Sequence, residues 1–160
     1  MDRDGLKKQA CAAIDAMASD LISASHDIHA NPELAFNEHF AHGLLTDRIE
    51  AAGLSVERGA CGLDTAFISE FGEAGVEVGI LSEYDALPGI GHACGHNIIA
   101  TSGLGATLAL SKLGTNLPGR VRYLGTPAEE AGNGKEIMAT QGALAGAAPA
   151  IVAAPAGGYP

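Results

Sequence analysis

The stretch VEVGILSEYDALPGIGHACGHNIIA, residues 76–100, decides the fold of this 160-residue chain. Val76, Val78 and Ile80 alternate with other residues, which predicts a short strand over 76–81. After a loop that contains two histidines and a cysteine, residues 98–113 are rich in Gly, Ala and aliphatic residues and predict a helix. A strand, a loop and a helix in succession are typical of an α/β sheet with helices on its faces.

The segments on either side extend this pattern. Upstream, helical spacing of apolar residues predicts a helix over 6–29 that ends at Asn31-Pro32, and a second helix from the cap residue Asn37 to Gly53. Short strands are predicted over 54–58 and 64–71. Downstream, the sequence predicts a buried strand over 120–124, a helix over 135–144 and a short strand over 150–153. We therefore expect an α/β fold in which helices precede and follow the strands.

Composition and charge limit the classes of partner and the cellular location that we expect. The chain is 47% hydrophobic and 18% charged, which is typical of a folded domain. Nine Lys and Arg against 19 Asp and Glu give a formal charge of -10, so we expect neither nucleic acid nor a membrane surface as a partner. The charged start MDRDGLKKQA differs from a secretory signal, and Cys11, Cys61 and Cys94 are too scattered for a disulfide framework. We expect a cytoplasmic location.

The side chains best suited to metal binding or catalysis follow two of the predicted strands. One loop contains Glu83, Asp85, His92, Cys94 and His96; the other is GTPAEEAGNGK, residues 125–135, with adjacent carboxylates Glu129 and Glu130. Functional sites of α/β folds lie at the carboxyl ends of strands. A thiolate, an imidazole and a carboxylate from separate loops are suitable ligands for zinc or a similar divalent metal. The pair of glutamates also offers a base that is not consumed as a ligand.

Each residue also has a structural interpretation when taken alone. Cys94 could be a small core residue, the two glutamates a solvated surface, and His92 a backbone cap. Cys11 and Cys61 are interpreted as structural. The same holds for the histidines on the predicted helices, which are His26, His29, His39 and His42.

Three segments resemble one known family. EYDALPGIGHACGHN, residues 83–97, and GTPAEEAGNGK resemble loops of the metal-dependent amidohydrolases and dipeptidases that include carboxypeptidase G, aminoacylase, p-aminobenzoyl-glutamate hydrolase and xaa-Arg (β-alanyl-lysine) dipeptidase-like proteins. HDIHANPELAFNEHFA, residues 26–41, resembles the opening of the same family.

The resemblance implies a zinc-peptidase-like three-layer α/β/α sandwich and a set of site residues. It implies Cys94, His96 and Glu130 as metal ligands, Glu129 as general base, and Asp85 as the acidic residue that supports the site; His92 receives no role. The implied cofactor is zinc or another divalent metal such as manganese. The implied substrates are small N-acyl amino acids, dipeptides or p-aminobenzoyl-glutamate-like amides, and full-length relatives are expected to be homodimers.

The sequence also departs from the family. Its members continue through a dimerisation domain and a C-terminal catalytic segment with a further ligand histidine, so residues 1–160 are expected to be the N-terminal part of the catalytic domain and inactive alone. Ala154 stands where the family usually has a ligand histidine, and Asn97 where many relatives have Asp. Two alternatives to an amide hydrolase stay open: an impaired, metal-binding or interaction module, and a cysteine hydrolase with Cys94 as nucleophile and His92 or His96 as base.

Overall fold

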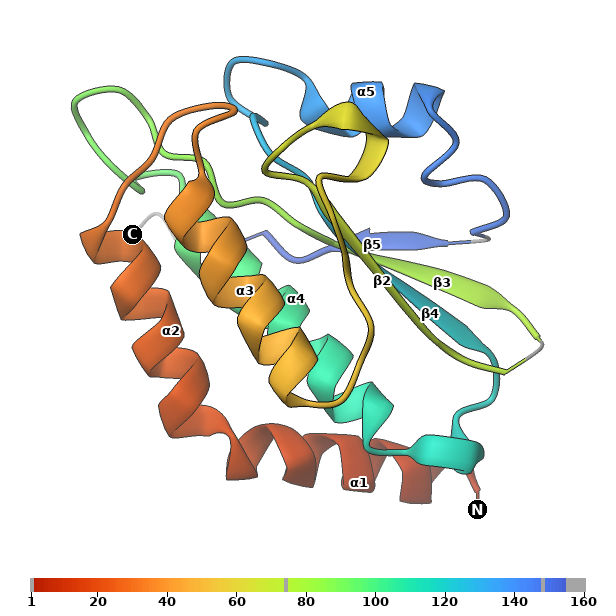
Figure 1. Ribbon diagram of the computed structural model, residues 1–160. Helices are drawn as coiled ribbons and strands as arrows, with labels where there is room; N and C mark the ends of the chain where they lie inside the picture. Colours follow the sequence, from red (N-terminus) through yellow and green to blue (C-terminus); the bar gives the residue numbers. More distant parts are fainter. Residues whose placement is uncertain (1, 74, 148, 155–160) are drawn as a thin grey trace, which may run out of the picture.

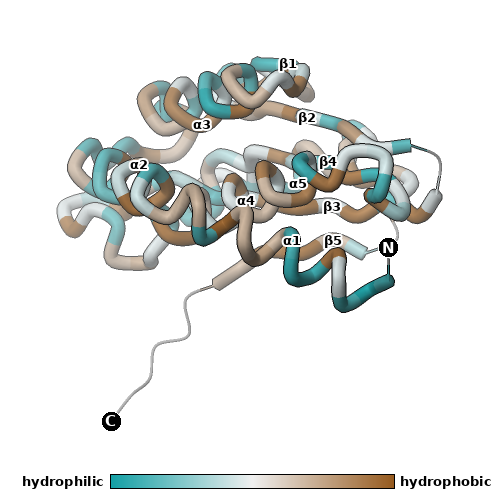
Figure 2. Tube along the Cα trace, turned by 90° about the horizontal axis from the view of Figure 1, so that it is seen from below, coloured by the Kyte–Doolittle hydropathy of each residue, from teal (hydrophilic) through white to brown (hydrophobic). Residues whose placement is uncertain are grey.

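The computed structural model describes residues 2–73, 75–147 and 149–154 (Figure 1). Within these residues the strands form one five-stranded sheet of order β1-β2-β4-β3-β5. The strands are β1 (Glu57–Arg58), β2 (Phe67–Gly72), β3 (Glu77–Ser82), β4 (Arg120–Gly125) and β5 (Ala150–Val152). Figure 2 shows this order from top to bottom, with hydrophobic residues along β3.

The pairing of β3 and β4 places the loops that follow these two strands at the same end of the sheet. These strands are parallel, and their last residues, Ser82 and Gly125, lie opposite each other. The same register pairs Leu81 with Leu124. The loops that follow β3 and β4 therefore begin side by side, as expected for the carboxyl ends of parallel strands.

Helices cover both faces of the sheet, so the expected three-layer α/β/α sandwich is confirmed (Figure 1). The alternation of side chains along a strand creates two cores: Ile80 and Tyr123 belong to one, and Leu81 and Leu124 to the other. The first core includes residues of α2 (Ala18–Ala30), α3 (His39–Ala51) and α4 (His96–Ser111), with α1 (Arg3–Ala16) packed on α4. The second core includes residues of α5 (Gly134–Thr140) and the short 3-10 helix η1 (Ala60–Gly62), and a second 3-10 helix, η2 (Gly114–Asn116), precedes β4.

Helix α4 lies close to its neighbours at two positions where it has glycine. A Cβ atom at Gly103 would collide with the Ser82 hydroxyl, and one at Gly105 would lie 2.9 Å from the Leu21 side chain. The close approach lets the Ser82 hydroxyl donate a hydrogen bond of 3.1 Å to the carbonyl oxygen of Ala100. The start of α4 is thereby fixed beside the end of β3.

Some predicted boundaries differ from the structure. The single helix expected over 6–29 is two helices, α1 and α2, which separate at Met17 (φ −105°, ψ 2°). The break lets α2 lie along α4 while α1 crosses its far end (Figure 1). Helix α3 is preceded by Glu38 as N-cap instead of Asn37, β1 has two residues, and β2 begins at Phe67 because η1 and a turn occupy the residues before it. Helix α5 ends at Thr140, ahead of a series of turns.

Candidate metal centre

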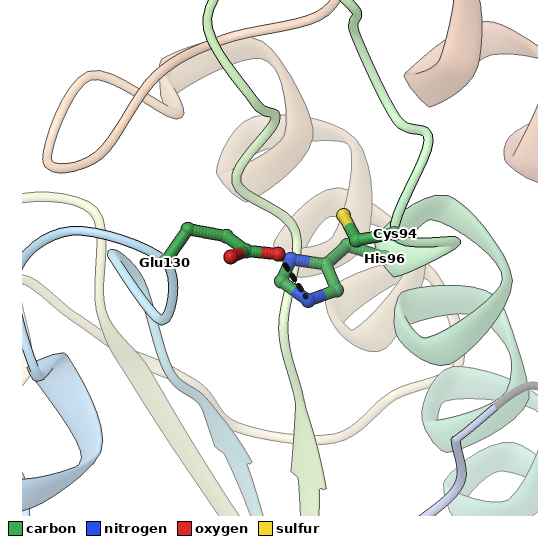
Figure 3. A group of neighbouring side chains, drawn as sticks. All are labelled: Cys94, His96 and Glu130. Carbon is green, nitrogen blue, oxygen red and sulfur yellow. Dashed lines mark ion pairs between the residues drawn. The ribbon is translucent and has the colours of Figure 1, made fainter.

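Three side chains of different chemistry converge at the carboxyl ends of β3 and β4. The sulfur of Cys94, a ring nitrogen of His96 and a carboxylate oxygen of Glu130 all lie within 4.8 Å of one another. Figure 3 shows Cys94 and His96 at the start of α4 and Glu130 reaching toward them from the loop after β4. The structure thus brings together the three residues expected to be ligands.

The local backbone explains how Cys94 and His96, two positions apart, point to one place. Gly95 between them has a left-handed conformation (φ 81°) and is the N-cap of α4. Its amide donates a hydrogen bond of 3.0 Å to the carbonyl oxygen of His92. This conformation is readily available only to glycine, so the turn that aligns the thiol with the imidazole depends on Gly95.

Asp85 fixes the orientation and the tautomer of His96. The His96 Nδ1 atom lies 2.9 Å from the Asp85 carbonyl oxygen and 3.0 Å from its Oδ1 atom. Because a carbonyl oxygen can only accept, Nδ1 carries the proton, and in the neutral ring Nε2 presents its lone pair to the site. An imidazole held in this way by a carboxylate is the usual arrangement of a metal-binding histidine.

Asp85 also connects the two loops. It is fully buried, and its Oδ2 atom accepts a hydrogen bond of 2.9 Å from the backbone amide of Glu130. Burial disfavours the charged form of Asp85, but the hydrogen bonds from His96 and Glu130 outweigh it and hold the pKa of Asp85 below its usual value. Burial likewise opposes protonation of His96. The nearby carboxylates of Asp85 and Glu83 outweigh this effect and raise the pKa of His96.

The carboxylates around His96 outnumber the nearby cations. His96 Nε2 lies 3.4 Å from Glu83, 3.8 Å from Glu129 and 3.8 Å from Glu130. Glu83, His96 and Glu129 form a second group whose ligand atoms lie within 4.8 Å of one another. Lys135 forms an ion pair with Glu83 and lies 3.7 Å from Glu129. A divalent cation would balance the remaining negative charge, and thiol, imidazole and carboxylate are ligands it accepts, so the residues fit a metal.

The environment of Cys94 does not favour a catalytic nucleophile. Burial and the Glu130 carboxylate raise the pKa of the Cys94 thiol. A catalytic cysteine needs the opposite shift, which a neighbouring cation or a metal provides. The structure therefore gives no support to the cysteine-hydrolase alternative.

The remaining candidates lie at or beyond the margin of this centre. His92 is 5% exposed, and neither of its ring nitrogens has a partner at ideal hydrogen-bond geometry in the described residues, although the backbone of Ile28 lies near its ring. It lines a cleft of about 410 Å³ beside Cys94, together with His29. Ala154 is exposed just after β5. Burial and the nearby His96 and His29 lower the pKa of His92.

Two residues of the centre had no role assigned from the sequence. Glu83 is 5% exposed and faces His96, and Lys135 neutralises it from the first turn of α5. Their positions in the sequence could have indicated them. Glu83 is the first charged residue after β3, and Lys135 is the only cation in the GTPAEEAGNGK segment.

Comparison with known proteins identifies the family. Residues 79–157 match Peptidase family M20/M25/M40. The chain is 44% identical over 154 residues to a mouse (Mus musculus) Xaa-Arg dipeptidase, covering 87% of this chain and 36% of that protein. It is 32% identical over 149 residues to one of the subunits of p-aminobenzoyl-glutamate hydrolase from Escherichia coli K12, covering 81% of this chain and 31% of that protein.

A solved structure agrees with these relatives. The Bacillus subtilis YXEP protein, described as a dinuclear metal-binding peptidase of family M20, superposes with a TM-score of 0.78 at 28% identity, covering 85% of this chain and 42% of that one. The chain belongs to the M20/M25/M40 peptidase family, as the loop sequences implied. It spans about a third of the length of the curated relatives it matches. Among the described residues, no helix combines the length and hydrophobicity needed to span a bilayer.

Proposed function

We propose that this chain forms part of the active site of a metal-dependent hydrolase of amide bonds. The observation that carries the proposal is the convergence of Cys94, His96 and Glu130 within 4.8 Å, beside a second carboxylate, Glu129. Cys94, His96 and Glu130 would hold the metal, and Asp85 would orient His96. A divalent metal bound there would supply Lewis acidity toward the amide carbonyl and lower the pKa of water.

The protein's own residues would handle the proton. Glu129 has a carboxylate oxygen 3.8 Å from His96 Nε2, so it lies beside the ligands while its side chain stays partly open to solvent. From this position Glu129 would accept a proton from the attacking water and deliver it to the leaving amine. The Lys135 ammonium lies 3.7 Å from the Glu129 carboxylate and would help to hold it in place beside the ligands.

Zinc is the metal best suited to this set of ligands, because a cysteine thiolate and an imidazole match its preference, with manganese as the alternative. The substrates would be dipeptides, small N-acyl amino acids or p-aminobenzoyl-glutamate-like amides. The names of the mouse and Escherichia coli relatives support this range.

The arrangement of the whole protein is also a proposal. Residues 1–160 would correspond to the N-terminal part of a metallopeptidase catalytic domain, which the partial coverage of the relatives supports. We further propose a cytoplasmic, homodimeric full-length protein. A metal-binding module without catalysis is the second candidate function, because Ala154 supplies no ligand where the family resemblance implies a histidine.

Metal content tests this proposal. We expect less than one equivalent of zinc to stay tightly bound through gel filtration, and we expect Cys94→Ser to lose it. Cys61→Ser is the matched control, because Cys61 is also a partly buried free cysteine and belongs to neither ligand group. Elemental analysis of the three proteins decides: equal zinc in Cys94→Ser and wild type would refute the ligand assignment.

A further inference from the structure

One buried carboxylate outside the metal centre binds the loop that carries Glu129 and Glu130. Glu38, which is fully buried, lies in the NPELAFNEH segment before α3. Its Oε1 atom accepts hydrogen bonds from the backbone amides of Phe36, at 3.0 Å, and Ala128, at 2.8 Å. Its Oε2 atom accepts a hydrogen bond of 2.7 Å from the Thr65 hydroxyl.

Both amides that share this oxygen belong to residues in an unfavourable backbone conformation. Phe36 has φ 63° and Ala128 has φ 58°, in the left-handed region that residues with a Cβ atom rarely adopt. Such conformations persist only where the surrounding structure holds them. Ala128 immediately precedes Glu129, so its backbone angles determine where both glutamates lie.

The segment around Glu38 is itself attached to both loops of the metal centre. The carbonyl oxygen of Glu33 accepts a hydrogen bond of 2.7 Å from the amide of Ala86, next to Asp85. The Phe36 ring occupies the space that a side chain at Gly132 would need. The Glu33 carboxylate accepts hydrogen bonds from the first turn of α3, which anchors the segment to that helix.

We propose that Glu38 is a positioning residue that holds Ala128 in its left-handed conformation and so directs Glu129 and Glu130 toward His96. The Glu129–Glu130 backbone is then fixed on both sides by buried carboxylates, with Glu38 on the amide of Ala128 and Asp85 on the amide of Glu130. This role deepens the proposed function and rests on it for the effect on the metal. The hydrogen bonds themselves do not depend on the metal.

Hydrogen exchange of the metal-free chain tests the positioning role directly. In the wild type, the Phe36 and Ala128 amides should exchange as slowly as amides within β4. Glu38→Ala should accelerate exchange at these two amides by about tenfold or more, because it leaves buried donors without an acceptor. Glu38→Gln keeps an acceptor oxygen and should stay close to wild type. Thr65→Val is the matched control, because it removes a partner of Oε2 and leaves the Oε1 contacts.

Zinc affinity provides the second measurement. Glu38→Ala should weaken zinc binding about tenfold, with Glu38→Gln and Thr65→Val near the wild-type value. Fast exchange of the Phe36 and Ala128 amides in the wild type would overturn the proposal without any variant. Uniform acceleration across all amides in Glu38→Ala would indicate a role in global stability and would also overturn it. If the wild type binds no zinc, the proposed function fails, while exchange at Ala128 still decides the role of Glu38.

Discussion

Glu129 and Glu130 are adjacent in the chain but lie in different surroundings. Glu130 belongs to the group with Cys94 and His96, and its amide is bound to Asp85. Glu129 belongs to the group with Glu83 and lies near Lys135. Both carboxylates lie 3.8 Å from His96 Nε2, so the proposal of Glu130 as metal ligand and Glu129 as base follows the roles that the family resemblance implies.

Replacing each glutamate by glutamine separates the two roles. Glu129→Gln should leave the zinc content nearly unchanged and lower any hydrolysis of p-aminobenzoyl-glutamate or a dipeptide by about 100-fold to 10,000-fold, because the amide keeps the shape and loses the base. Glu130→Gln should lose zinc. Elemental analysis and an amide-hydrolysis assay of both variants provide the measurement. Loss of zinc in Glu129→Gln with retention in Glu130→Gln would mean that the assignments are reversed.

At the scale of elements, α3 joins the NPELAFNEH segment, which contacts both loops of the metal centre, to the sheet. His42 of this helix is buried, and its ring packs 6.0 Å from that of Phe67 on β2. Burial lowers the pKa of His42 below 6.5, and the nearby Arg58 and His39 lower it further, while the Ala66 backbone and the Asp47 carboxylate oppose them. The folded protein therefore binds a proton at His42 less readily than the unfolded chain does.

This difference predicts a loss of stability in mild acid. Because the unfolded chain takes up the proton first, the free energy of unfolding should decrease as pH falls through 6.5, with up to about 1.4 kcal/mol lost per pH unit from this residue. His42→Gln should show a shallower dependence. Urea unfolding at several pH values measures it, with His26→Gln as control, because His26 is exposed and lies on α2. Identical pH slopes for His42→Gln and wild type would rule out this contribution.

The elements were predictable where local signals and packing agree. Residues 76–100 show strand alternation and helical composition, and β3, the loop and α4 follow within about two residues. The break at Met17 has no such signal, because Ala and Met favour helix on both sides and only packing on α4 separates α1 from α2. The role of Glu38 was also hidden, because its partner Ala128 lies 90 positions away in the chain.

At the scale of the whole molecule, the sheet has a closed centre and an open edge. Both β3 and β4 have a neighbour on each side. Strand β5 pairs with β3 alone among the described residues, and its Ile151 and Val152 are 56% and 44% exposed. An apolar edge strand of this kind can pair with a second chain.

The open edge predicts self-association of the 160-residue chain. Ile151→Lys should shift the chain toward monomer, because a charge on an edge strand disfavours pairing between chains. Ile22→Lys is the matched control, because Ile22 is equally exposed, at 56%, but lies on α2. Sedimentation velocity at several concentrations measures the shift. Equal effects of the two substitutions would show that β5 is not the contact.

The central claim is that Cys94, His96 and Glu130 hold a metal, and X-ray absorption spectroscopy of the zinc-loaded chain tests it most directly. We expect one sulfur ligand at about 2.3 Å together with nitrogen and oxygen ligands at about 2.0–2.2 Å. The sulfur contribution should disappear in Cys94→Ser and persist in Cys61→Ser. A wild-type spectrum with nitrogen and oxygen ligands alone would contradict the claim.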